Sequence, residues 1–432
     1  MHQEGLAAIR EDVRRNAGRH LDLLKEGLKV SFTNLSVFQS WVAERMRDCG
    51  LRVEEFTVDR NELDRQPACR RTLMEEPTAL QQGPNMVGRW PGAEPSGGLL
   101  VYAHADKIPE TFHWGRQNPE MEERNGRLHG PGIADDVSGV TGMLSAVDTY
   151  LRLGFEDRRK LTIASILGKQ LSVYGTYGLM SRYGPLPNAL YVHPAESGAG
   201  LGEIHISSNG MLEFRIGIQG KPPNTGDAFH TIYERDMLSP ADAGVHVVQK
   251  LHDWAARASR RYRHPRLEEE TGRSVALLVS RISTVGDNAA YQIARSCVLE
   301  GTVCFAPPTG LEAMREEFEQ ALDEAVADHP RLSPAALRLE WGDNMGEAVQ
   351  SDEKGPLARA AERILEEITG RAPSLTYAYS LSDIRYPIHH WGADAIGIGP
   401  RCGNLGKTDE WIDREEYLGT IMAATGILRE LT

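Results

Sequence analysis

Three short segments carry side chains that can bind a metal ion. In HADKIP, His104 lies two residues before Asp106, and such a carboxylate can hold one ring nitrogen while the other binds metal. Asp135 follows in GPGIADDVSG, where glycines let the backbone approach an ion closely. Glu196 in HPAES offers another carboxylate, and His193 of the same segment competes for that role. Imidazoles and carboxylates are typical zinc ligands, so these segments predict a metal site.

Each segment alone also has an ordinary structural interpretation. His104 and Asp106 could be neighbours on the surface, and Glu196 could be a plain loop carboxylate. Asp135 could simply cap the start of a helix. The metal interpretation gains from the positions of the segments, because each of them adjoins an element that is expected to be buried.

The surrounding pattern predicts a mainly parallel α/β sheet with flanking helices. The expected elements are buried strands at 98–104, 161–167 and 188–194 and a helix at 138–153. Strands that alternate with helices are typical of such sheets, which bind ligands beyond the carboxyl ends of their strands. His104, Gly168 and Glu196 all lie at those ends, so we expect them to meet.

From about residue 211 the pattern indicates a smaller inserted domain. MLEFRIGIQG alternates like a strand with one exposed face. The next expected elements are a helix at 240–258, strands at 274–282 and 297–305, a helix at 310–328 and a strand at 336–341. The order β-α-β-β-α-β resembles a ferredoxin-like unit. We therefore predict an α/β domain of residues 1–210 and 344–432, split by an α+β domain of residues 211–343.

The chain ends and one internal region complete the expected layout. Helices are expected at 5–28, 34–49 and 414–430, a strand at 395–399, and a loop at 60–96.

Composition excludes several kinds of partner. The 432 residues carry a net charge of −13, whereas nucleic acid requires a basic face. An anionic membrane surface is disfavoured for the same reason, and no stretch approaches the ~20 apolar residues that span a bilayer. The N-terminus has no apolar signal core. Five scattered cysteines without a CxxC pair indicate reduced thiols and a cytoplasmic location.

Taken together, the motifs resemble those of the metallopeptidase and amidohydrolase family that includes glutamate carboxypeptidase, acetylornithine deacetylase, succinyl-diaminopimelate desuccinylase and aminoacylase. Besides the three segments above, SLSDIRYP (380–387) and IGIGPRCGNLGKTDEWID (396–413) resemble family motifs, so the resemblance covers nearly the whole chain. It implies a two-metal site in which His104, Asp135 and Glu196 hold one ion, and Asp135 bridges to the second. It also implies that Asp106 orients His104, and that the Asp135–Asp136 peptide is cis.

The sequence departs from the family at the second metal. The family's paired glutamates align with Lys169 and Gln170, so Lys169 stands in place of the general base and Gln170 in place of a ligand. The family's last ligand, a histidine four residues before a glutamate, aligns with Gly406 when counted back from Glu410. The Lys169 ammonium could partly replace the charge of the missing cation. Alternatively, Lys169 is a surface lysine and the alignment is shifted.

Substrate contacts are also changed. Asn224 stands where the inserted domain of relatives carries a histidine that steadies the reacting carbonyl, although His230 could substitute. Cys304 stands where relatives carry an arginine for a substrate carboxylate. Three residues match substrate-contact positions of the family, and they are Asn288, Asp383 and Arg385.

Three functional interpretations follow. The preferred one is an enzyme with a remodelled site that uses one divalent metal, zinc first, or none, on a small amide or amino-acid derivative, and not as a standard peptidase. The others are a non-catalytic relative that binds a ligand or partner, and a conventional N-acyl amino acid or dipeptide hydrolase. A histidine such as His389 or His390 could rescue the second metal, although packing is the plainer role for both. The resemblance also implies a homodimer formed through the inserted domain.

Overall fold

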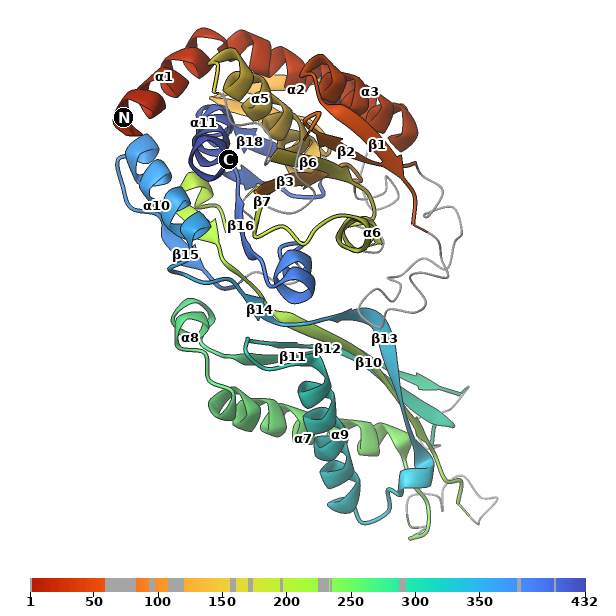
Figure 1. Ribbon diagram of the computed structural model, residues 1–432. Coiled ribbons are helices and arrows are strands. Elements are labelled where there is room, and N and C mark those ends of the chain that lie inside the picture. Colours follow the sequence, from red (N-terminus) through yellow and green to blue (C-terminus); the bar gives the residue numbers. More distant parts are fainter. Residues whose placement is uncertain are drawn as a thin grey trace. The chain divides into compact units, whose positions relative to one another are not determined.

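The computed structural model of the chain describes residues 2–58, 83–92, 98–107, 120–155, 161–169, 174–194, 197–223, 233, 235–286, 293–378, 382–407 and 409–432. It divides into two compact units (Figure 1). The first unit comprises Met1–Ser207, Gln350–Thr376 and Ser382–Thr432, and the second comprises Ser208–Val349 and Tyr377–Leu381.

The first unit is built on an eight-stranded sheet with the order β1-β2-β6-β3-β7-β16-β8-β15. Its strands are β1 (Arg52–Phe56), β2 (Asn85–Arg89), β3 (Leu99–His104), β6 (Leu161–Ile166), β7 (Asn188–Val192), β8 (Glu203–His205), β15 (Ser374–Thr376) and β16 (Asp394–Ile398). The central pairs β6–β3, β3–β7 and β7–β16 are parallel, whereas β1–β2 and β2–β6 are antiparallel. The predicted mixed sheet with a mainly parallel centre is confirmed.

Helices cover this sheet and bury its continuous apolar strands. They are α1 (His2–Arg15), α2 (Ala17–Ser31), α3 (Leu35–Asp48), α5 (Ser138–Arg152), α6 (Tyr174–Arg182), α10 (Pro356–Thr369) and α11 (Arg414–Leu431). Helix α5 packs on β3 and β7, and α10 packs on β16. Figure 1 shows α2, α3 and α5 together on one side of the sheet. Every residue of β3 and β6 is buried, as a two-sided cover requires.

Smaller strands and turns complete the first unit. They include β4 (Glu122–Arg124), β5 (Arg127–His129), β17 (Cys402–Gly403), β18 (Trp411–Asp413), and the short helices η4 (Ile133–Val137), η5 (Gly200–Gly202) and η8 (Pro387–Trp391). Strands β17, β18, β5 and β4 form a separate four-stranded sheet. Strand β9 (Ser207–Ser208) pairs with β14 (Val349–Gln350).

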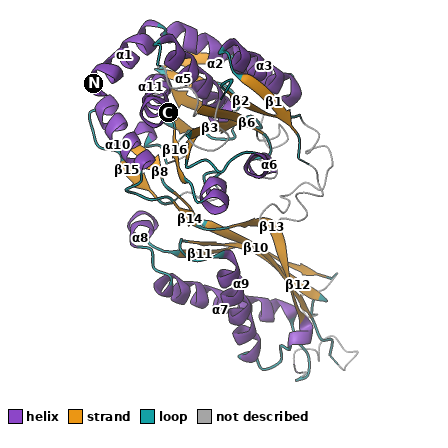
Figure 2. Cartoon of the chain, viewed as in Figure 1, coloured by secondary structure: helices purple, strands orange, loops and turns teal. Residues whose placement is uncertain are grey.

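The second unit has a four-stranded antiparallel sheet with the order β11-β12-β10-β13. Its elements are β10 (Gly210–Gln219), α7 (Pro240–Arg261), α8 (Pro265–Thr271), β11 (Val275–Val285), β12 (Ser296–Phe305), α9 (Leu311–Ala327), η7 (Pro334–Ala336) and β13 (Leu337–Gly346). Figure 2 shows α7 and α9 along one face of the sheet. The alternating burial of β10 and β12 follows from this one-sided cover.

Three details of the expected layout were wrong or incomplete. Residues 5–28 form two helices rather than one, because Asn16 interrupts them, and its side chain donates a hydrogen bond to the carbonyl of Asp12. The expected loop at 60–96 contains β2, while its residues 59–82 and 93–97 lie outside the described part of the chain. Helices α6, α8 and α10 were not predicted, although α8 and α10 each begin with a proline suited to a helix start. Among the described residues, no helix is long and apolar enough to cross a membrane.

Candidate metal centre

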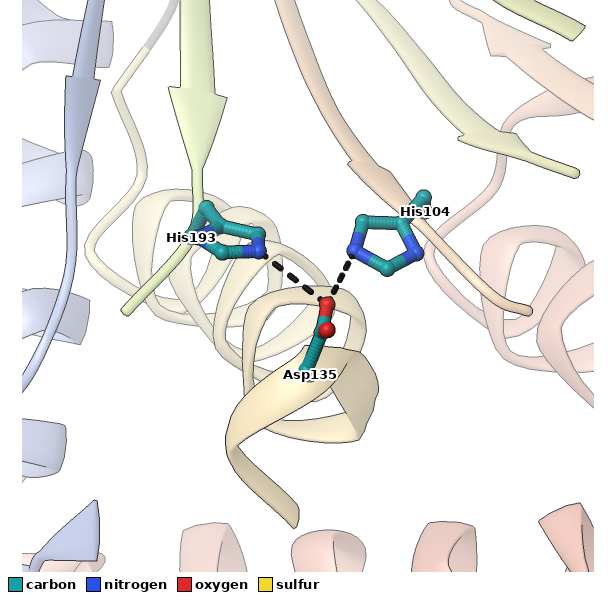
Figure 3. A group of neighbouring side chains, drawn as sticks. All are labelled: His104, Asp135 and His193. Carbon is teal, nitrogen blue, oxygen red and sulfur yellow. Dashed lines mark hydrogen bonds and ion pairs between the residues drawn. The ribbon is translucent and has the colours of Figure 1, made fainter. Parts of the chain in front are cut away.

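Three buried side chains from three parts of the first unit point their ligand atoms at one another (Figure 3). His104 ends β3, His193 follows β7, and Asp135 lies in η4. Their ligand atoms all lie within 4.8 Å of one another. The Asp135 Oδ1 atom is 2.8 Å from His104 Nε2 and 3.3 Å from His193 Nε2. Strands β3 and β7 are parallel neighbours, so their carboxyl ends bring the two histidines together.

The outer nitrogen of each imidazole faces an oxygen of its own segment. His104 Nδ1 lies 3.0 Å from the Asp106 carbonyl oxygen and 3.4 Å from its carboxylate Oδ1. His193 Nδ1 lies 2.9 Å from the Pro194 carbonyl oxygen. With its proton on Nδ1, each ring would present the Nε2 lone pair to a metal ion, whereas a proton on Nε2 would donate to Asp135 Oδ1. Oxygens in this outer position are typical of metal-binding histidines.

Asp135 is presented by a tight glycine-rich turn before α5. Gly132 has a φ of +75°, which favours glycine, and the Asp135–Asp136 peptide is cis, as predicted. The next carboxylate, Asp136, accepts a hydrogen bond from the Gly139 amide at 2.9 Å. Burial raises the pKa of the Asp136 carboxyl well above its usual range.

Glu410 holds the backbone of this turn, a role that sequence reasoning missed. Its carboxylate accepts hydrogen bonds from the amides of Ala134 at 2.6 Å, Asp135 at 2.8 Å and Gly132 at 3.3 Å. The Gly406 amide also donates to it, at 3.2 Å. Burial, followed by the nearby Asp135 charge, raises the pKa of Glu410 to about 7. The sequence signal is faint, because a single buried glutamate after a glycine-rich loop has many possible roles.

Lys169 brings a positive charge into the centre. It follows β6, the parallel neighbour of β3, and its side chain is only 12% exposed. Its ammonium nitrogen lies 3.4 Å from Asp135 Oδ1 and 3.3 Å from His193 Nε2, and its backbone amide donates to Asp106 Oδ1 at 3.2 Å. Lys169 is thus directed at the donors rather than at solvent.

These charges shift the protonation of all three donors. Burial alone would raise the pKa of Asp135, but the Lys169 ammonium and hydrogen bonds from the two histidines hold it well below its usual range. Burial, followed by the Lys169 charge, lowers the pKa of His193 to about 3. Burial also disfavours the charged form of His104, but Asp106 and Asp135 outweigh it and raise the pKa to about 10.

The donor set suits one divalent cation. Two imidazole nitrogens and a carboxylate oxygen already converge in a buried space, and this combination is typical of zinc. Nearby, Gly406 has no side chain, and Lys169 places an ammonium 3.4 Å from Asp135 Oδ1. Gln170 and Glu196 lie outside the described residues. His389 and His390 are exposed in η8 and are not members of this donor cluster.

Of the residues predicted to contact substrate, the structure describes Asp383 and Arg385. Asn224, His230 and Asn288 lie outside the described residues. Asp383 is fully buried and accepts a hydrogen bond from the Thr176 hydroxyl at 2.7 Å, and burial raises the pKa of its carboxyl. Arg385 donates to the Tyr386 hydroxyl at 2.9 Å, while its Nε and Nη1 have no hydrogen-bond partner in the described structure. Cys304 is half-buried in β12.

We compared the chain with protein families, with known sequences and with solved structures. The family model described as Peptidase family M20/M25/M40 matches residues 100–430. The chain is 22% identical over 346 residues to a succinyl-diaminopimelate desuccinylase of Rhodopseudomonas palustris. The aligned region covers 77% of this chain and 80% of that protein. The chain is 21% identical over 389 residues to N-formyl-4-amino-5-aminomethyl-2-methylpyrimidine deformylase of Bacillus subtilis, with 85% and 82% covered. The solved aminopeptidase PepT of Bacillus cereus superimposes with a TM-score of 0.71 at 15% identity, over 96% of this chain and 98% of that one.

Proposed function

The chain belongs to peptidase family M20/M25/M40, and on that premise we propose that it hydrolyses a small amide or related carbonyl compound with at most one divalent metal ion. The membership predicted from the motifs is confirmed. We further propose that its substrate is not a standard peptide.

The observation that carries the proposal is the position of Lys169. Its ammonium lies 3.4 Å from Asp135 Oδ1, the carboxylate that the family resemblance assigns as the bridge between two metals. A positive charge there repels a second cation and compensates the buried carboxylate in its place. By the family resemblance, Gln170 and Gly406 occupy the two positions at which relatives carry the remaining ligands of the second ion. One metal position is therefore disfavoured by both charge and ligands.

The remaining position would be held by His104, Asp135 and a third ligand, either His193 or Glu196. Zinc bound there would polarise an amide carbonyl and lower the pKa of a bound water. Asp106 would keep the His104 ring in place through its contacts with Nδ1. Lys169, while protonated, would stabilise negative charge on the reacting group but could not accept the proton of water.

Other residues would shape the substrate site. We assign Gln170 and Asn224 to catalytic positions and Asn288, Asp383 and Arg385 to substrate contacts, following their match to the family motifs. Arg385 supports this assignment, because two nitrogens of its buried guanidinium, Nε and Nη1, have no hydrogen-bond partner in the described structure and could donate to oxygen acceptors of a ligand. Relatives named as a desuccinylase and a deformylase favour an N-acylated small molecule.

We also propose that the second unit serves as a lid and as the contact between two copies of the chain. Its edge strand β11 exposes three apolar side chains, Leu278, Ile282 and Val285. An edge strand with apolar side chains tends to pair with another strand.

The negative net charge and scattered cysteines favour a cytoplasmic protein without nucleic-acid or membrane partners.

Metal stoichiometry tests the proposal. We expect elemental analysis after dialysis to find no more than one tightly bound divalent ion per chain. His104→Ala should abolish binding, whereas His389→Ala, a matched change of an exposed histidine, should not. Two ions retained per wild-type chain would contradict the proposal and favour a conventional hydrolase.

A second candidate function is ligand binding without catalysis. It is favoured by the same Lys169 contact, which satisfies the buried Asp135 carboxylate without any ion. A chain that takes up no zinc, cobalt or manganese on reconstitution, and turns over no amide, would support this candidate instead.

A further inference from the structure

A Tyr-x-His sequence occurs twice, at the ends of two neighbouring strands. It is Tyr102-Ala103-His104 at the end of β3 and Tyr191-Val192-His193 at the end of β7. Tyr102 and Tyr191 are register partners in the parallel pair β3–β7. Residues two apart in a strand share a face of the sheet. The two tyrosines and the two histidines therefore lie on one face, in two adjacent rows.

The four rings form a continuous stack. Ring centroids of Tyr102 and Tyr191 are 4.9 Å apart, those of Tyr191 and His193 are 5.1 Å apart, and those of His193 and His104 are 5.4 Å apart. The angles between successive ring planes are 30°, 21° and 25°. All four side chains are buried, at 1% relative exposure or less. Aromatic rings at these separations attract one another and resist rotation of a ring out of the stack.

Rotation matters at His193 because its ring direction decides where Nε2 points. The Pro194 carbonyl lies 2.9 Å from Nδ1, and Asp135 Oδ1 and Lys169 Nζ each lie 3.3 Å from Nε2. These polar contacts act at the edge of the ring, whereas the Tyr191 ring, inclined by 21°, packs on its face and restricts its tilt. The Lys169 ammonium would compete with a metal ion for the Nε2 lone pair.

We propose that Tyr191 is a positioning residue that fixes the ring plane of His193 and thereby makes His193 the third metal ligand. This inference rests on the proposed metal centre. Tyr191 does not touch the metal or the substrate. Its ring centroid lies 5.1 Å from that of His193 and 6.4 Å from that of His104. We assign its effect to the closer ring, His193, so that effect should disappear when the third ligand has no ring.

The test measures zinc affinity by competition with a chelator, together with the visible absorption spectrum of the cobalt-loaded chain. Tyr191→Phe keeps the ring and should bind zinc within about threefold of wild type. Tyr191→Met and Tyr191→Leu remove the ring and should bind at least about tenfold more weakly, the range found when residues behind metal ligands are changed. Their cobalt spectra should also shift. Tyr150→Leu removes an equally buried ring outside the stack and should leave both readouts unchanged.

A double variant isolates the ring-on-ring contact. His193→Glu supplies a ligand without a ring, and adding Tyr191→Met to it should not weaken zinc binding further. If Tyr191→Met and Tyr191→Leu fold and bind zinc as tightly as wild type, the proposal is overturned. It is also overturned if His193→Ala keeps wild-type zinc affinity while Glu196→Ala loses it, because Glu196 would then be the third ligand. If neither Tyr191→Met nor Tyr191→Leu folds, Tyr191 serves the core and the proposal is equally overturned. A wild-type chain that binds no metal would instead refute the proposed metal centre itself.

Discussion

The Lys169 ammonium nitrogen lies 3.3 Å from Nε2 of His193. This nitrogen is one of the three donor atoms, with those of His104 and Asp135, that face one another in the candidate metal centre. A metal ion bound at the proposed centre would therefore compete with this lysine for the same imidazole. This competition leads to the first prediction.

Lys169→Met should tighten zinc binding. A unit-charge pair at 4 Å is worth about 4 kcal/mol at an effective dielectric constant of about 20, so removal of the ammonium should strengthen binding at least about tenfold. The same variant should lower the melting temperature of the metal-free chain, because Asp135 loses its compensating charge. Lys169→Arg keeps the charge and serves as the control. Competition titration with a chelator gives the affinities, and an unchanged affinity in Lys169→Met would contradict the electrostatic argument.

Glu410→Ala should destabilise the fold. It would leave the amides of Gly132, Ala134 and Asp135 without their acceptor in a buried turn. A buried polar group that loses its partner costs about 1–3 kcal/mol, and three such losses do not simply add, so we expect a loss of about 3 kcal/mol. Glu410→Gln keeps one acceptor oxygen and should cost less. Urea denaturation measures the difference, with Glu415→Ala, an exposed neighbour on α11, as the control within about 0.5 kcal/mol. Equal stability of Glu410→Ala and Glu415→Ala would refute this role.

His20 should make the protein sensitive to acid independently of the metal centre. Burial, followed by the Arg152 charge, lowers the pKa of His20 to about 4, and its Nε2 has no hydrogen-bond partner among the described residues. A histidine with a lowered folded-state pKa favours the folded state fully above its unfolded pKa of about 6.5. That stabilisation is lost as pH falls from 6.5 towards 4, by up to about 3 kcal/mol.

The check is urea denaturation of wild type and His20→Leu at pH 8 and pH 4.5. We expect a smaller loss of stability at pH 4.5 in the variant. His252→Leu, which changes an exposed histidine on α7, should behave like wild type. Parallel pH dependence of His20→Leu and wild type would show that other groups control acid unfolding.

Hydrolysis of N-acetyl amino acids and dipeptides should be negligible. Lys169 stands where the family resemblance places the general base, and general-base catalysis alone contributes about 10²–10⁴-fold. A substrate panel with added zinc, cobalt or manganese tests this expectation. Turnover of about 1 per second or faster, ordinary for an enzyme, would mean that another residue supplies the base.

Restoring the family residues should create a second metal position. The variant Lys169→Glu, Gln170→Glu and Gly406→His should bind one more ion than wild type, as measured by elemental analysis. Gly406 has a φ of +66°, so the histidine there is strained and should cost about 1–2 kcal/mol. Lys169→Glu with Gln170→Glu alone is the control for that strain. A triple variant that is folded but gains no ion would show that the two segments do not meet as the family motifs imply.

Much of the fold follows from local pattern. The strands at 99–104, 161–166 and 188–192 were predicted within two residues at each end, because fully apolar runs between loops can form only buried strands or helices. The interruption at Asn16 and the strand β2 were missed. The spacing of apolar residues reveals neither feature. The apolar residues on both sides of Asn16 keep a three- and four-residue spacing, and the short strand β2 lies in a region rich in Pro and Gly.

Side-chain identity and chain order, read from the sequence alone, determined the family, the α/β class and the presence of His104, Asp106 and Asp135 at strand or helix ends. The roles predicted for all of the site residues stay predictions, and Gln170, Glu196, Asn224 and Asn288 also lie outside the described residues. Only the tertiary structure decided that His193 faces Asp135, that Lys169 points inward, and that Glu410 holds a turn 275 residues earlier in the chain. The physical reason is that secondary structure depends on neighbours along the chain. The convergence of donors and the sign of their charges depend instead on which strands pair and on which groups burial forces together.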